Sequence, residues 1–229
     1  MVFGNPDLGD ARYNLGYAEE EAVTIAKEFS LAKVLLKTEA TETAFKKIGG
    51  QFTYLHFATH GQFDSNSPLN SRLLLAKDAE NDGLLTVGEL YSLHLEADLV
   101  TLSACETGLG KINSGDDIVG LSRGFLYAGA RSIVGSLWSV EDSSTAALMA
   151  SFYKNLKTMS KVEALRQAQL NLIHGSVNSD LLARRGIGGV GKLGETPAAK
   201  APAQDSASMS ISTSHPYFWA PFILVGEGK

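Results

Sequence analysis

Cysteine is nearly absent from this sequence of 229 residues, in which Cys105 stands alone. A single cysteine cannot form an internal disulfide framework or the cysteine cluster of a zinc ribbon. Two interpretations of Cys105 then remain open. It is a small buried apolar residue, as free cysteines commonly are, or it is a reactive thiol, which requires a histidine partner and a position at the end of a strand.

The sequence also lacks long apolar runs and an excess of basic residues. No run approaches the roughly 18 apolar residues of a membrane-spanning helix. The opening segment MVFGNPDLGD lacks the charged start and apolar stretch of a signal peptide. The net charge is −5, from 20 basic and 25 acidic residues, whereas nucleic-acid-binding domains usually carry a basic excess. We therefore expect a cytoplasmic protein that binds neither membrane nor nucleic acid directly.

What the sequence does contain is an ordinary globular composition, with 44% hydrophobic and 20% charged residues. The length predicts a single large domain over residues 1–229. Because Met1 falls almost inside the first expected strand, we expect this domain to be the C-terminal part of a longer protein.

Strand-like and helix-like segments alternate along the chain. We expect strands at 2–6, 32–37, 53–61, 97–105 and 130–140, and helices at 17–29, 38–50, 86–95, 115–130, 142–157 and 161–175. Such alternation predicts an α/β fold, with a mainly parallel central sheet and helices on both faces.

Three segments add to this pattern. The run LNSRLLLAKD and the following Asn81-Asp82-Gly83 predict a hairpin arm and its turn. Residues 186–214 are rich in Gly, Ala, Ser and Pro, so they cannot bury enough surface to offset their ordering entropy, and we expect a flexible insertion loop. The final run HPYFWAPFILVGEGK is dense in aromatic and aliphatic residues, so we expect a terminal strand that docks into the sheet.

Two patterns that could bind ligands are weak. His56 and His60 are spaced like ligands on one helix face, but on a strand they would lie about 13 Å apart, and no acid or cysteine cluster completes a metal site. Gly108 and Gly110 precede a helix without the full phosphate-loop spacing, and two acids follow them. We therefore expect neither a metal nor an organic cofactor.

His60 and Cys105 form the pattern that favours catalysis. They are 105 − 60 = 45 residues apart, and each follows an expected buried strand. Carboxyl ends of parallel strands are where sites form in open α/β sheets, so neighbouring strands would bring imidazole and thiol within reach. A histidine lowers the pKa of a thiol or takes its proton. The backbone amides of Gly61 and Cys105 are natural oxyanion donors.

Four segments resemble the CHAT domain, a caspase-like module often found after tetratricopeptide repeats: HFATHGQFD, LSACETGLG, GLSRGFLYAGARSIVGSLWSVED and HPYFWAPFILVG. They follow the expected order through nearly the whole chain. The resemblance implies a three-layer caspase-like or separase-like sandwich and a Cys–His dyad at Cys105 and His60. It also implies an upstream repeat or sensor domain. The caspase signature Q-A-C-x-G is replaced by S-A-C-E-T-G.

We therefore expect a cysteine endopeptidase that cleaves protein substrates through a thioester, without a metal or organic cofactor. An extended substrate would pair with a sheet edge near Gly135–Trp138. The candidate substrate-binding residues are Ser136, Trp138, Glu106, Asp116, Asp117 and Asp142. A buried acid among them would favour Arg or Lys before the scissile bond.

The alternatives remain open at this point. Acids are favoured at helix N-termini, which accounts for Asp116, Asp117 and Asp142 without a pocket. Trp138 and Trp219 could line a peptide groove, form a docking face or pack in the core. The competing function is a non-catalytic interaction domain that works with partner modules. An acyltransferase or amidase using the same dyad is a third possibility.

Overall fold

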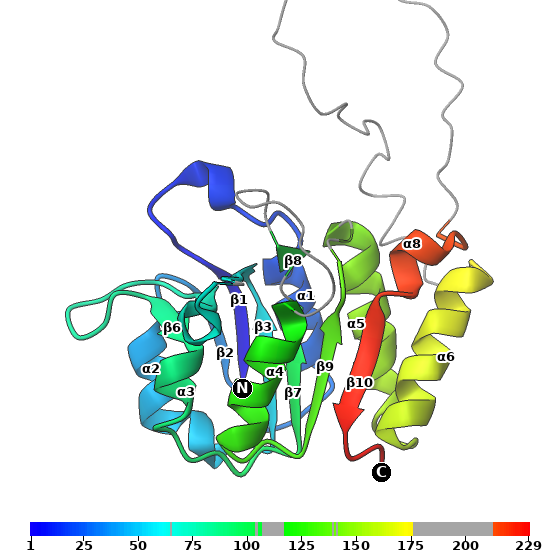
Figure 1. Cartoon of the computed structure of the whole chain (residues 1–229). Helices are drawn as coiled ribbons and strands as arrows, with labels where there is room; N and C mark the ends of the chain where they lie inside the picture. Colours follow the sequence, from blue (N-terminus) through cyan, green and yellow to red (C-terminus); the bar gives the residue numbers. More distant parts are fainter. Residues whose placement is uncertain (65, 104, 107–116, 139, 141, 176–212) are drawn as a thin grey trace, which may run out of the picture.

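The computed structural model describes residues 1–64, 66–103, 105–106, 117–138, 140, 142–175 and 213–229. Its centre is a six-stranded sheet with the order β10-β9-β7-β3-β1-β2. Five strands are parallel: β1 (Val2–Pro6), β2 (Val34–Lys37), β3 (Tyr54–Ala58), β7 (Leu99–Leu102) and β9 (Ser132–Ser136). β10 (Phe222–Gly226) pairs antiparallel with β9. The predicted mainly parallel α/β architecture is confirmed (Figure 1).

Helices cover both faces of this sheet. On one face lie α2 (Glu42–Ile48), α3 (Val87–Leu90) and α4 (Asp117–Tyr127), and on the other lie α1 (Ala18–Ala26), α5 (Asp142–Asn155) and α6 (Lys161–Ile173) (Figure 1). A hydrophobic cluster lies between the central sheet and the helices on each face. There are two clusters because neighbouring residues of a strand point to opposite faces of the sheet. Phe3 joins Phe45 and Phe125 in one cluster, whereas Val2 joins Leu148 in the other.

The hydroxyl residues before several helices explain where those helices begin. The side chain of Thr41 accepts a hydrogen bond from the backbone N–H of Ala44 at the start of α2. Thr86 and Ser160 each form a reciprocal capping box, at the starts of α3 and α6. Such caps satisfy backbone donors that the first helical turn leaves unpaired.

A second sheet of four short strands, in the order β6-β5-β4-β8, lies at the carboxyl ends of the central strands (Figure 1). It comprises β4 (His60–Gln62), β5 (Arg72–Leu74), β6 (Leu84–Thr86) and β8 (Cys105–Glu106). β5 pairs antiparallel with both β4 and β6, and β4 pairs parallel with β8. The expected hairpin arm is therefore confirmed.

Short helical segments complete the chain. The 3-10 turns are Ala11–Tyr13, Gly49–Gln51 and Pro68–Asn70, and α8 (Pro216–Trp219) precedes β10. Within the described part of the chain, no helix is both long and apolar enough to cross a membrane. Of the expected flexible loop 186–214, all but 213 and 214 lies outside the described residues.

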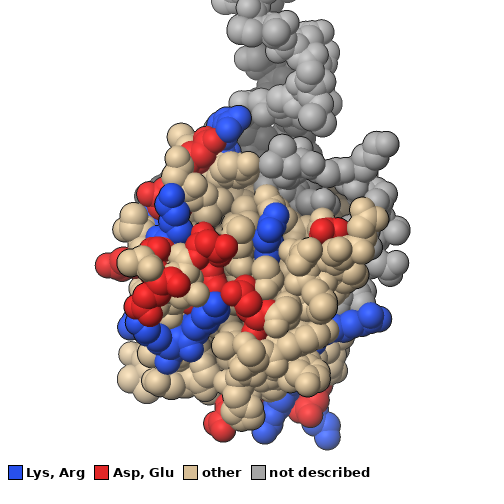
Figure 2. All heavy atoms as spheres, turned by 60° about the vertical axis from the view of Figure 1, so that its left-hand side comes forward, with Lys and Arg blue, Asp and Glu red and all other residues tan. Residues whose placement is uncertain are grey.

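Several ion pairs lie on the side of the molecule that carries α2. Lys46 lies between Glu42 and Glu89, and Lys47 pairs with Glu80. Figure 2 shows acidic and basic side chains interleaved on this face. The exposed Lys47–Glu80 pair contributes little to stability, whereas the Glu42 carboxylate that Lys46 contacts is buried.

Three expectations about strands and helices were wrong in detail. Each of the expected strands 53–61 and 97–105 is divided between the two sheets, as β3 and β4 and as β7 and β8. The helix expected over 86–95 is the short α3, Val87–Leu90. The segment from Gly135 is not a free edge, because β10 occupies that side of β9 from Ser132 to Ser136. The apolar C-terminal run takes the position that a substrate was expected to take.

The turn after β5 depends on Gly83, and this generates a prediction. Gly83 has φ +85, and a Cβ there would overlap the carbonyl oxygen of Leu75. We expect Gly83→Ala to lower the free energy of unfolding by at least about 1 kcal/mol. Gly88→Ala is the control, because its Cβ would meet nothing closer than 3.6 Å. Chemical denaturation of both variants measures the free energy of unfolding. A Gly83→Ala variant as stable as Gly88→Ala would contradict the prediction.

Candidate active site

The register between β3 and β7 places the candidate site. Tyr54 pairs with Leu99 and Phe57 with Leu102, and beyond the division between sheets His60 pairs with Cys105. The differences 99 − 54, 102 − 57 and 105 − 60 all equal 45. The parallel register is therefore kept from the central sheet into the small one. Neighbouring strands lie about 4.8 Å apart, so the backbones of His60 and Cys105 are adjacent.

The His60 imidazole is held at one nitrogen, while the other has no partner among the residues that the structure describes. The side chain is buried, with 4% exposed. Nε2 lies 2.7 Å from the backbone carbonyl oxygen of Tyr13, and the Tyr13 ring packs edge-on against the imidazole. Because a carbonyl only accepts, Nε2 carries the proton and Nδ1 carries the lone pair in the neutral ring. Nδ1 has no hydrogen-bond partner among the described residues.

Burial also determines the protonation state of His60. Desolvation lowers the pKa of the imidazole below the ordinary histidine value, and the Tyr13 carbonyl offsets part of this by favouring the charged form. The ring is therefore neutral near pH 7, with Nδ1 able to accept a proton.

The loop that carries Tyr13 is itself tethered through buried Asn5, which follows the Gly4 position of β1. Asn5 has φ +48, its amide donates to Asn14 and Glu19, and its carbonyl oxygen accepts from the Leu15 N–H. The sequence predicts a strand at 2–6 here, and its pattern singles out neither Asn5 nor the Tyr13 carbonyl.

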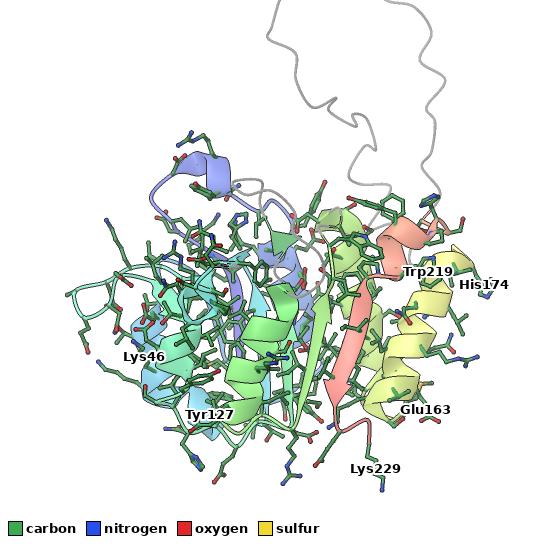
Figure 3. All side chains as sticks on the ribbon, in the orientation of Figure 1. Lys46, Tyr127, Glu163, His174, Trp219 and Lys229 are labelled. Atoms are coloured by element: carbon green, nitrogen blue, oxygen red, sulfur yellow. The ribbon has the colours of Figure 1, made fainter. Side chains whose placement is uncertain are left out.

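The predicted substrate-binding residues are only partly brought together. Ser136, at the end of β9, is buried and donates to the Trp138 carbonyl. Trp138 is 38% exposed, and its indole N–H donates to the carbonyl of Tyr217 in α8. Trp219, on the same helix (Figure 3), packs partly against the core and donates to the Ser214 carbonyl.

The acids differ in what they do. Asp142 begins α5 and accepts a hydrogen bond from the Tyr17 backbone N–H at 2.9 Å, which ties the loop after β1 to that helix. Asp117 begins α4, and Glu106 pairs with Gly61 through the backbone. Asp116 lies outside the described residues. The position of Asp142 as the first residue of α5 supports the helix-start interpretation for that residue.

His56 belongs to a different network. It lies in β3, where Nε2 contacts Glu21 at 2.8 Å and Nδ1 contacts the Tyr153 hydroxyl, which donates to Thr101. In the described part of the chain, no group of three His, Cys, Asp or Glu side chains could hold a metal.

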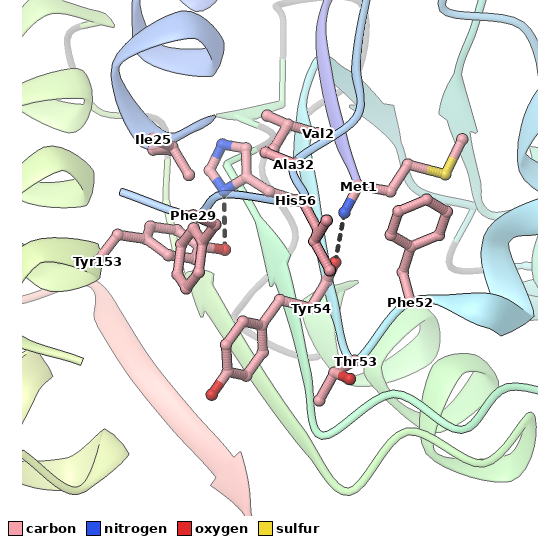
Figure 4. A pocket seen from close by; sticks show the side chains of 11 residues that line it. Met1, Val2, Ile25, Phe29, Ala32, Phe52, Thr53, Tyr54, His56 and Tyr153 are labelled. Atoms are coloured by element: carbon pink, nitrogen blue, oxygen red, sulfur yellow. Dashed lines mark hydrogen bonds between the residues drawn. The ribbon is translucent and has the colours of Figure 1, made fainter. Parts of the chain in front are cut away.

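A cavity of about 300 Å³ adjoins His56 at the amino ends of β1 and β3 (Figure 4). Its lining is mostly apolar and includes Ile25, Phe29 and Phe52. The cavity lies at the opposite end of the sheet from His60, so it is not part of the candidate active site.

Comparison with known proteins agrees with this architecture. Residues 1–227 match the family described as the CHAT domain. Tetratricopeptide repeat protein 28 of Mus musculus is 26% identical over 265 residues, and its Homo sapiens counterpart is 27% identical over 266. Each match covers 99% of this chain but only 9% of the relative. The chain thus spans about a tenth of the length of these relatives, and the resemblance seen in the sequence is confirmed.

The burial of His60 predicts its titration. In Cys105→Ala, which removes coupling to the thiol, we expect an imidazole pKa below the ordinary 6.5 by NMR. Protonation then favours the unfolded chain, so this group's contribution to stability falls as pH drops from about 6.5 through the lower folded-state pKa. The urea-unfolded chain is the control and should titrate near 6.5. A folded-state value at or above 6.5 would contradict the assignment.

Proposed function

The chain belongs to the CHAT domain family, and from this we propose that it is a cysteine endopeptidase domain in which Cys105 is the nucleophile and His60 the general base and acid. The observation that carries the proposal is the register that pairs His60 with Cys105, together with a buried imidazole whose Nδ1 has no partner among the described residues. Family membership supports the caspase-like fold of the proposal, and the site chemistry supports the activity.

The proposed reaction begins with proton transfer. His60 Nδ1 takes the thiol proton of Cys105, and the thiolate attacks the carbonyl carbon of the scissile peptide. The amides of Gly61 and Cys105 would stabilise the oxyanion. The Tyr13 carbonyl, at 2.7 Å from Nε2, favours the imidazolium that forms.

Collapse of the tetrahedral intermediate completes acylation and leads to hydrolysis. The C–N bond breaks, His60 gives its proton to the leaving amine, and a thioester to Cys105 remains. Water then attacks the thioester carbonyl with His60 as base, which releases the carboxylic acid and restores the thiol.

A second candidate function is an interaction domain without catalysis. Both relatives are named for tetratricopeptide repeats, which supports a repeat module as a partner of such domains. The exposed Trp138 and Tyr217, joined by a hydrogen bond, would suit a docking face. Catalysis remains the better supported candidate, because a docking face would not require the buried His60.

The dyad generates the first functional prediction. Cys105→Ala and His60→Ala should each abolish cleavage of a randomised peptide pool, because one removes the nucleophile and the other its base. Thermal unfolding should show both variants folded. His174→Ala is the matched control, since His174 is exposed beyond the end of α6, and it should cleave like the parent. Undiminished cleavage by either dyad variant would refute the assignment.

The acidic residues after Cys105 generate a second functional prediction. If Glu106, Asp116 and Asp117 contact the residue before the scissile bond, Arg or Lys there should be cleaved faster than Asp or an apolar residue, since an opposite charge compensates a buried carboxylate. Asp117→Ala should lose this preference without losing cleavage of neutral peptides. A fluorogenic series that varies only this residue measures it. Faster cleavage after Asp or Leu would exclude an acidic pocket.

A further inference from the structure

Arg72 differs from the other cations of this protein. It begins β5, is half-buried, and has no carboxylate within ion-pairing distance among the described residues. The other described Lys and Arg residues without a carboxylate partner are all exposed: Lys27, Lys33, Lys77, Arg123, Arg131, Lys154, Arg166 and Lys229. Partial burial of a cation without an opposite charge costs free energy. An anion from outside the described residues that bound Arg72 would offset this cost.

The Arg72 guanidinium is already oriented by a neutral neighbour. Arg72 pairs directly with Gln62 of β4, and its Nε donates to the Gln62 side-chain oxygen at 2.8 Å. This bond satisfies one of five donors and neutralises no charge. The terminal nitrogens keep the planar fork that binds carboxylates.

The strand pairing places Arg72 on the same sheet face as His60. Directly paired residues of antiparallel strands share a face, and alternate residues along a strand do so too. His60 pairs with Leu74 and Gln62 with Arg72, so His60 and Arg72 are diagonal neighbours about 7–8 Å apart. Leu73, between them in register, points to the opposite face and is fully buried in the core.

The order of the strands says which half of a substrate Arg72 would meet. Within the small sheet, β4 with His60 lies between β8 with Cys105 and β5 with Arg72. In the proposed reaction His60 protonates the leaving amine, so the leaving half of the substrate must lie over the imidazole. A chain that continues away from Cys105 then passes Arg72 after two or three residues, at about 3.3 Å per residue.

We propose that Arg72 is a specificity-determining residue that binds a substrate carboxylate, from Asp or Glu, two or three residues after the scissile bond. This inference rests on the proposed peptidase function and adds a substrate class to it. Gln62 acts as the positioning residue of the guanidinium.

The test uses the full chain and a randomised peptide pool, with cleavage positions read by mass spectrometry. The parent chain should enrich Asp and Glu two or three residues after the cleaved bond by about tenfold over Asn and Gln, and high salt should reduce this. Arg72→Gln should remove the enrichment, and Arg72→Glu should replace it by Lys and Arg. Arg131→Gln, an exposed arginine at the other end of the sheet, should keep it.

A binding arm separates this inference from the proposed function. Fluorescence anisotropy on Cys105→Ala, with an acidic peptide and its Asn counterpart, should show tighter binding of the acidic peptide that Arg72→Gln abolishes. Cleavage without charge preference, or a preference that survives Arg72→Gln, would overturn the role of Arg72 and leave the peptidase intact. Absence of any cleavage by the parent chain would overturn the peptidase function, whatever the binding arm shows.

Discussion

The register between β3 and β7 is the constraint on which the rest of the candidate site depends. Two parallel strands held at a constant offset of 45 residues continue into β4 and β8, so the same register pairs the backbones of His60 and Cys105. A slip of one residue would reverse which faces the strand residues present. Residues such as Phe57 and Leu102, buried in the core, oppose such a slip, so core packing also sets the spacing of the site.

A second requirement is that His60 stays neutral and oriented. Its burial lowers the pKa of the ring, and the Tyr13 carbonyl fixes the tautomer. The loop that supplies this carbonyl is held just after Tyr13, where the backbone N–H groups of Leu15 and Tyr17 donate to Asn5 in β1 and to Asp142 at the start of α5. A buried imidazole nitrogen without a hydrogen-bond partner costs free energy; Nδ1 of His60 has none among the described residues, and a role as base in a reaction would explain that cost.

Sequence patterns predicted the architecture well where a signal existed. Apolar runs located the parallel strands, the Asn-Asp-Gly turn located the hairpin, and the 45-residue spacing of His60 and Cys105 turned out to be the register itself. The patterns failed where the determinant is tertiary. Nothing local in the sequence marks the Tyr13 carbonyl as an acceptor or Asn5 as its support. The β9 edge that was expected to bind substrate is instead paired with β10 of the C-terminal run, which buries Phe222 there.

Reactivity of Cys105 towards a peptidyl electrophile tests the central claim most directly. With its base in place, Cys105 should form a covalent adduct in the native chain at neutral pH, identified by mass spectrometry of the modified peptide. His60→Ala should slow this strongly, because the thiolate is the reacting form, while His174→Ala should not. A native Cys105 that stays unmodified, or reacts no faster than in the unfolded chain, would contradict the assignment of a catalytic dyad.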